Sequence, residues 1–143
     1  MKQVSIETFA VSGSSIRTNN KAEASSSGKI PDLWREFYTS HPNPDKKVYG
    51  VYSNYESDAT EEFTVTVGTR GDAEMNSGVS IESGTYLAFP ANGSMPAAII
   101  NAWKTVWEHF SLRQPYARAY ETDFEEYNGP ESATIFIGIK TSS

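Results

Sequence analysis

One pattern of large side chains occurs twice in the 143-residue chain, and it limits the fold more than any other feature. The matched residues, each pair 69 positions apart, are Ile30 and Ile99, Trp34 and Trp103, Arg35 and Lys104, and Tyr38 and Trp107. At the same offset, residues 53–56 (Ser-Asn-Tyr-Glu) match residues 122–125 (Thr-Asp-Phe-Glu). Because two separate motifs share one offset, we interpret the chain as an internal duplication.

The order of expected elements supports this interpretation. Hydrophobic periodicity and turn residues predict a strand from Val4 ending near Ser12, a helix beginning at Pro31, and strands within residues 46–57 and 61–70. They then predict a broken strand at 79–93, a helix at 94–112, and strands at 116–128 and 132–140. Strand–helix–strand–strand, repeated, predicts an α+β fold of two pseudo-symmetric βαββ modules with antiparallel sheets and a ligand cleft at their junction. We expect one domain over residues 1–143, with halves at about 1–70 and 78–143.

Composition and charge exclude several classes of function. The absence of cysteine excludes disulfides, a thiol nucleophile and cysteine-ligated metals. The chain has neither an HExxH motif nor a phosphate-binding glycine loop, so we expect no metal and no cofactor. A formal charge of −6 without a basic cluster disfavours direct binding to nucleic acid. With no long apolar run and no secretory signal, we expect a cytoplasmic protein without membrane contact.

Two matched glutamates are the candidate binding groups. Side chains alternate between the faces of a strand, so Glu125 shares a face with Tyr127, and Glu56 shares one with Tyr52. The opposite faces are expected to pack as core, through Val51 and Tyr55 in the first half and Phe124 in the second. The alternative is that both glutamates are solvated on an open face, as most glutamates are.

Aromatic residues make up 13% of the chain, against 38% hydrophobic residues in all. Trp34, Trp103 and Trp107 lie at helical spacing, where tryptophans usually belong to a core, although one at a cleft edge could stack on a ligand. A carboxylate among aromatic rings suits a lipophilic organic cation, because ring faces attract positive charge and the carboxylate supplies the counter-charge.

The second half also resembles the GyrI-like (gyrase-inhibitor-like) effector-binding domain, which follows DNA-binding modules in AraC-type and MerR-type regulators. The matching residues, in order, are Gly84, Tyr86, Phe89, Gly93, Ile99, Trp103, Trp107, Phe124-Glu125-Glu126-Tyr127 and Ile137-Gly138-Ile139-Lys140. One departure is Gly138, where the family usually has proline, and we expect it to loosen only an edge or a turn.

The resemblance implies a cleft for hydrophobic, often cationic, small molecules, with Glu125 as the central acid. Lacking a DNA-binding module, the sequence is similar to the free-standing effector-binding proteins of integron gene cassettes. The leading hypothesis is a non-enzymatic binding protein whose ligand contacts are Glu125, Tyr127, Tyr52, Glu56, Trp34, Trp103 and Trp107. Some stand-alone relatives resemble hydrolases of cyclopropane-bearing alkylators. If this chain were such an enzyme, Glu125 would be the general base for water and Tyr127 its positioner or acid. A third hypothesis is an interaction with DNA gyrase or another regulatory protein partner.

Overall fold

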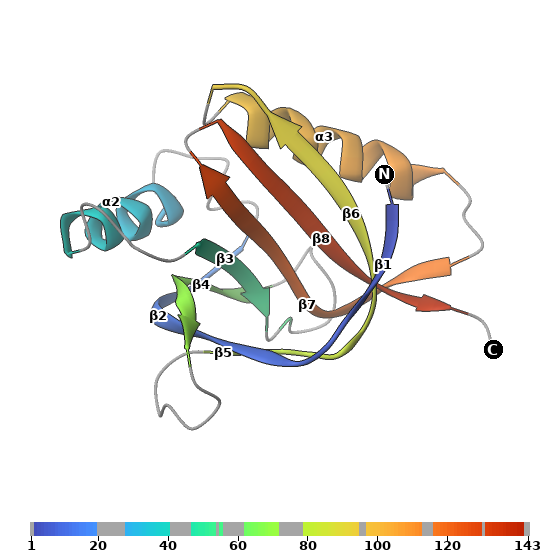
Figure 1. Ribbon diagram of the computed structural model, residues 1–143, viewed down its shortest axis with the longest axis horizontal. Coiled ribbons are helices and arrows are strands. Elements are labelled where there is room, and N and C mark those ends of the chain that lie inside the picture. Colours follow the sequence, from blue (N-terminus) through green and yellow to red (C-terminus); the bar gives the residue numbers. More distant parts are fainter. Residues whose placement is uncertain are drawn as a thin grey trace.

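In the part of the chain that the structure describes, the fold is one curled antiparallel sheet with two helices on it (Figure 1). The computed structural model describes residues 2–19, 28–40, 47–53, 55, 62–71, 79–94, 97–112, 116–129 and 131–141. The strands are β1 (Lys2–Ile6), β2 (Phe9–Thr18), β3 (Val48–Ser53), β4 (Phe63–Gly71), β5 (Val79–Ile81), β6 (Gly84–Asn92), β7 (Tyr116–Gly129) and β8 (Ser132–Thr141). The helices are α2 (Ile30–Ser40) and α3 (Ala97–Ser111). The α+β class and the antiparallel pairing predicted from the sequence are confirmed.

The sheet has the strand order β1-β6-β8-β7-β3-β4-β2-β5, and strands β7 and β3 meet at its centre. Their register places Gly50 opposite Glu125 and Ser53 opposite Thr122. Residues of the two halves of the sequence are therefore hydrogen-bonded neighbours in the middle of the sheet.

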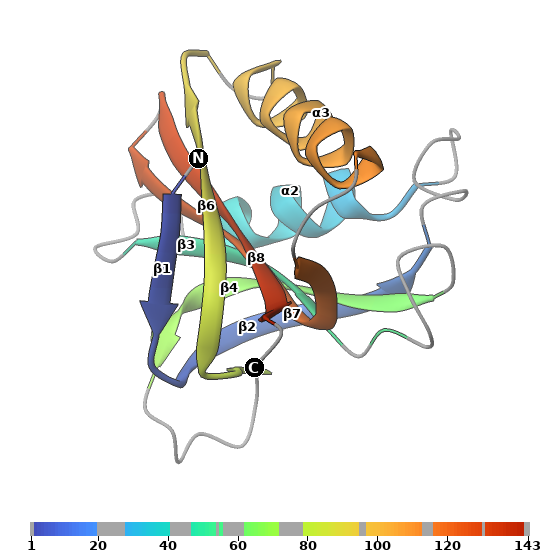
Figure 2. The ribbon, with the colours of Figure 1, turned by 90° about the vertical axis from the view of Figure 1, so that its right-hand side faces the viewer.

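Both helices pack on the same face of the sheet, as the view along the curl shows (Figure 2). Helix α3 buries Ile99, Ala102 and Val106 against β6 and β8, and helix α2 buries Leu33 and Phe37 against β2 and β4. Pro31 in the first turn of α2 and the apolar residues at spacing three and four explain why these segments are helical. The side chain of Tyr127 packs against both helix-side clusters, so it marks the place where they meet.

The opposite face of the sheet has an apolar cluster of its own. Val51 and Phe124 belong to it, together with Val11, Tyr49, Ile81 and Tyr86. The prediction that Val51 and Phe124 are core residues is confirmed. The alternation of faces along the two central strands thus separates this cluster from the side chains that face the helices.

The expected end of the first strand is wrong. Residues 2–18 form two strands, and β2 continues past Ser12 to Thr18. Gly13, whose neighbourhood looked like a strand end, lies opposite Gly68 of β4. A Cβ at Gly13 would lie 1.9 Å from the carbonyl oxygen of Val67, so glycine permits a close approach of two strands at this point.

Neither helix in the described ranges has the length and apolar character needed to cross a membrane.

Candidate functional site

Glu125 lies at the centre of the sheet and points toward the helices. Only 3% of this residue is exposed, and its carboxylate receives three hydrogen bonds. The indole Nε1 of Trp103 donates to Oε2 at 2.6 Å, and the hydroxyl of Tyr52 donates to the same oxygen at 3.1 Å. The hydroxyl of Tyr127 donates to Oε1 at 2.8 Å. The donors come from α3, β3 and β7, so both halves of the chain hold this carboxylate.

The electrostatics of Glu125 are unusual because all three of these donors are neutral. Within the described residues, Glu125 has no ion pair with a basic side chain. Burial raises the pKa of Glu125, while the bonds from Trp103, Tyr127 and Tyr52 oppose that rise. Burial and the nearby carboxylate also raise the pKa values of Tyr52 and Tyr127 well above the ordinary value, so both hydroxyls remain donors at neutral pH. The result is a desolvated carboxyl group whose hydrogen-bond donors, among the described residues, are all neutral.

Aromatic rings flank the carboxylate from both helices. Trp34 of α2 meets Tyr127 edge to face, with ring centroids 5.1 Å apart, and Trp103 of α3 meets Tyr52 in the same way at 5.3 Å. Gly50 makes the close approach of Trp34 possible. A Cβ at Gly50 would lie 3.0 Å from Oε1 of Glu125 and 3.0 Å from Cζ2 of Trp34. We call Glu125, Tyr52, Tyr127, Trp34 and Trp103 the Glu125 site.

Each helix adds a second ring nearer the solvent. Trp107 is 55% exposed, and its ring centroid lies 6.2 Å from that of Trp103. Tyr38 is 43% exposed and stacks on Trp34 with centroids 6.0 Å apart. On both helices, therefore, aromatic rings run from the buried carboxylate to the surface.

The structure brings together five of the seven side chains predicted from the sequence as ligand contacts, namely those of the Glu125 site. Trp107 lies one helical turn further out, and Glu56 lies outside the described residues. The predicted common face of Glu125 and Tyr127 is confirmed. Sequence reasoning missed Tyr38, although it is the repeat partner of Trp107, and Gly50, which the sheet register alone places opposite Glu125.

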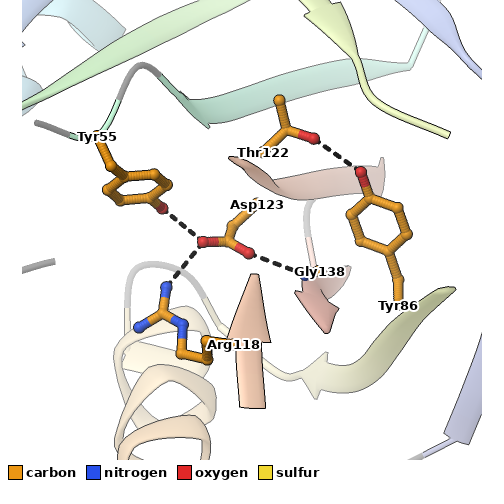
Figure 3. A network of polar contacts seen from close by, with 6 residues as sticks. All are labelled: Tyr55, Tyr86, Arg118, Thr122, Asp123 and Gly138. Carbon is orange, nitrogen blue, oxygen red and sulfur yellow. Dashed lines mark hydrogen bonds and ion pairs between the residues drawn. The ribbon is translucent and has the colours of Figure 1, made fainter. Parts of the chain in front are cut away.

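A second buried carboxylate is that of Asp123 (Figure 3). It lies two residues before Glu125 in β7, so strand alternation places the two side chains on the same face. Arg118 Nη2 donates to Asp123 Oδ2 at 2.7 Å, and the hydroxyl of Tyr55 donates to the same oxygen at 2.5 Å. The backbone N–H of Gly138 donates to Oδ1 at 2.9 Å. Unlike Glu125, Asp123 thus has a cationic partner as well as neutral donors.

Two predictions are wrong at this network. Tyr55 does not pack with Val51, because β3 ends at Ser53 and the alternation of faces does not extend to Tyr55. Gly138 does not loosen an edge: it is buried in β8, between β6 and β7. The pairing of β7 with β8 shifts register between Arg118 and Asp123, and there the N–H of Gly138 turns to the carboxylate of Asp123. Proline at this position would have no N–H to donate.

In the part of the chain that the structure describes, no group of three or more acidic or histidine side chains is placed to hold a metal ion.

Comparison with known proteins finds relatives in sequence and in fold. The Vibrio cholerae integron cassette protein VCH_CASS2 is 36% identical, with a TM-score of 0.86 over 97% of this chain and 95% of that one. SAV2435, whose structure was determined bound to tetraphenylphosphonium, has the same fold at 16% identity, with a TM-score of 0.75 over 97% of this chain and 93% of that one. The Bacillus subtilis protein YobU is 26% identical over 90% of each chain.

A family model described as an integron-associated effector binding protein, Cass2, matches residues 4–139. This match confirms the resemblance to integron-cassette effector-binding proteins, and the chain belongs to the Cass2 family of integron-associated effector binding proteins.

Proposed function

We propose that this protein binds a lipophilic organic cation and that Glu125 is the counter-charge. One observation carries the proposal: Glu125 is only 3% exposed, and within the part of the chain that the structure describes its carboxylate receives hydrogen bonds from neutral donors only. A buried charge normally has an opposite charge beside it, because the hydrogen bonds of neutral groups do not fully replace hydration. A cationic ligand would provide the opposite charge that the described residues do not place beside Glu125.

The rings around Glu125 favour a lipophilic cation over a metal ion or a small hydrated one. Each aromatic face near a cation contributes about 0.5–2 kcal/mol, and the larger value applies where water is excluded. Trp34, Trp103, Tyr52 and Tyr127 lie around the carboxylate, so a ligand beside Glu125 would have aromatic rings as neighbours. Tyr38 and Trp107 extend the same surface toward the solvent, so apolar arms of a ligand would also have partners.

The position of the site agrees with a junction between two βαββ modules. The two modules would be β2-α2-β3-β4 and β6-α3-β7-β8. In the sheet, the strands of the second module lie in the order β6-β8-β7, and the corresponding strands of the first follow in the reverse order, β3-β4-β2. A pseudo-twofold axis between β7 and β3 requires a residue on the axis to pair with its own repeat partner. Ser53 pairs with Thr122, and these residues are 69 positions apart, as are the matched tryptophans. We infer that Glu125 lines a cleft at this junction.

The relatives support the same ligand class. The family is one of effector-binding proteins. SAV2435, a neighbour in fold, was solved with tetraphenylphosphonium, a lipophilic cation that carries four aromatic rings.

A fluorescence titration with tetraphenylphosphonium tests the proposal, with intrinsic tryptophan emission as the signal. We expect wild-type protein to bind this cation and to bind neutral triphenylphosphine oxide far more weakly. Glu125→Gln should weaken cation binding by about thirty-fold or more, since it removes one member of a buried charge pair. Glu121→Gln is the matched control: it removes the same charge from an exposed position on the same strand, and it should leave binding unchanged.

Two results would contradict the proposal. One is equal binding of the phosphonium and the neutral oxide by wild-type protein. The other is unchanged cation affinity in Glu125→Gln, with both variants shown to be folded by circular dichroism.

A further inference from the structure

The Asp123 network bears on the charge of the ligand. Asp123 and Glu125 are both buried and share one face of β7. Two residues along a strand span about 6.6 Å, so the two carboxylates are near neighbours in a buried region. If both were unpaired, a ligand with two positive charges at that spacing would find a partner for each.

Arg118 prevents this. Its guanidinium contacts Asp123 Oδ2 at 2.7 Å, and the two side chains are 9% and 0% exposed. Tyr55 and Gly138 complete the hydrogen bonds of Asp123, so this carboxylate is held as one half of an ion pair (Figure 3). The formal charges of these three residues, −1 for Asp123, +1 for Arg118 and −1 for Glu125, sum to −1.

We propose that the Arg118–Asp123 pair sets the charge number of the ligand at one, so that the Glu125 site selects monocations over dications of the same shape. This inference rests on the proposed function. A second positive charge on the ligand would be desolvated without a partner, because Asp123 is already paired, and Arg118 would repel it. Arg118 is thus a specificity-determining residue that acts through Asp123.

The test uses two ligands that differ in one charge. The monocation 1-methyl-4-phenylpyridinium and the dication 1,1′-dimethyl-4,4′-bipyridinium have nearly the same outline. The nitrogens of the dication are separated by about the length of two strand residues. Each is titrated as a competitor of tetraphenylphosphonium. In wild-type protein we expect the monocation to bind at least about ten times more tightly than the dication. A tenfold difference in affinity is the same free energy as a shift of one pKa unit.

Three variants change the charge of the site in known steps. Asp123→Asn removes the carboxylate that faces the guanidinium of Arg118 and should weaken binding of the monocation. Arg118→Met exposes the ligand to a second carboxylate and should narrow or reverse the preference for the monocation. The double variant restores one net negative charge and should bind like wild type, since replacing both members of a buried pair is often tolerated. Arg35→Met, which removes an exposed charge from α2, is the control and should change neither affinity.

Several outcomes would overturn the inference. In wild-type protein these are a dication that binds as tightly as the monocation, or a monocation that fails to displace tetraphenylphosphonium. In folded single variants, an unchanged preference would do the same. If the single variants do not fold, loss of the preference in the double variant overturns the inference. In each of these cases, phosphonium binding that still depends on Glu125 would show that the proposed function stands and that only the inference about charge number fails.

Discussion

Replacing Trp103 with phenylalanine removes one hydrogen bond from Glu125 and keeps an aromatic ring in place. The indole N–H lies 2.6 Å from Oε2 of a carboxylate that is 3% exposed. A hydrogen bond to a charged buried group contributes about 1.5–3 kcal/mol, against about 0.5–1.5 kcal/mol for a neutral pair. At pH 8 we therefore expect the melting temperature of the ligand-free protein to fall by about 5–10 °C.

The loss should depend on pH in a definite direction. Burial raises the pKa of Glu125 in the folded state above 4.5, and the bond from Trp103 lowers it. The contribution of Glu125 to stability is then full below the unfolded-state pKa and is lost as the pH rises through the folded-state pKa. Trp103→Phe raises the folded-state pKa further, so the difference in unfolding free energy between variant and wild type should grow between pH 4.5 and pH 8.

Urea denaturation at the two pH values measures this difference. Trp34→Phe is the matched control, because it makes the same substitution on α2, where the indole packs against Tyr127 by its ring. Its cost should be the same at both pH values. A Trp103→Phe penalty that is constant or decreases from pH 4.5 to pH 8 would refute the assignment of Trp103 as a donor to an ionised, buried carboxylate.

Two further predictions concern stability. Glu125→Gln removes the titratable carboxyl group, whose folded-state pKa is raised. The unfolding free energy of the variant minus that of wild type should therefore rise from pH 4.5 to pH 8. A difference that does not change with pH in urea denaturation would argue against a desolvated carboxylate. Gly138→Ala would place a Cβ 3.1 Å from the carbonyl oxygen of Thr122 and should cost about 1–3 kcal/mol. Gly129→Ala, where a Cβ meets nothing within 4 Å, serves as its control, and equal unfolding midpoints for the two variants would show that Gly138 is not tightly enclosed.

The fold was largely predictable because its determinants are local or repeated. The helices around Trp34 and Trp103 follow from apolar spacing, and the offset of 69 residues linked them before any contact was known. Strand alternation placed Tyr127 beside Glu125. The alternation rule failed at Tyr55, because it holds only while a strand continues. The strand end predicted near Ser12 was wrong for another reason: a glycine such as Gly13 marks close approaches of two strands as well as strand ends.

The chemistry of the site was less predictable because it depends on contacts between distant segments. The indole of Trp103 could be assigned to a ring cluster from its spacing, but not to a hydrogen bond with Glu125. Arg118 and Asp123 are five residues apart on one strand, and only the register shift against β8 brings them together with the N–H of Gly138. A register shift has no reliable pattern in a single sequence, so the charge balance of the site emerges only from the assembled sheet.

The central claim is that Glu125 is the counter-charge of a bound cation, and a crystal structure of the complex with tetraphenylphosphonium tests it most directly. The claim predicts the phosphonium within about 6 Å of the Glu125 carboxylate and of the rings of Trp34 or Trp103, the range over which ring faces attract a cation. A phosphonium bound only at the exposed ring of Trp107, with Glu125 still held by its three neutral donors, would contradict it.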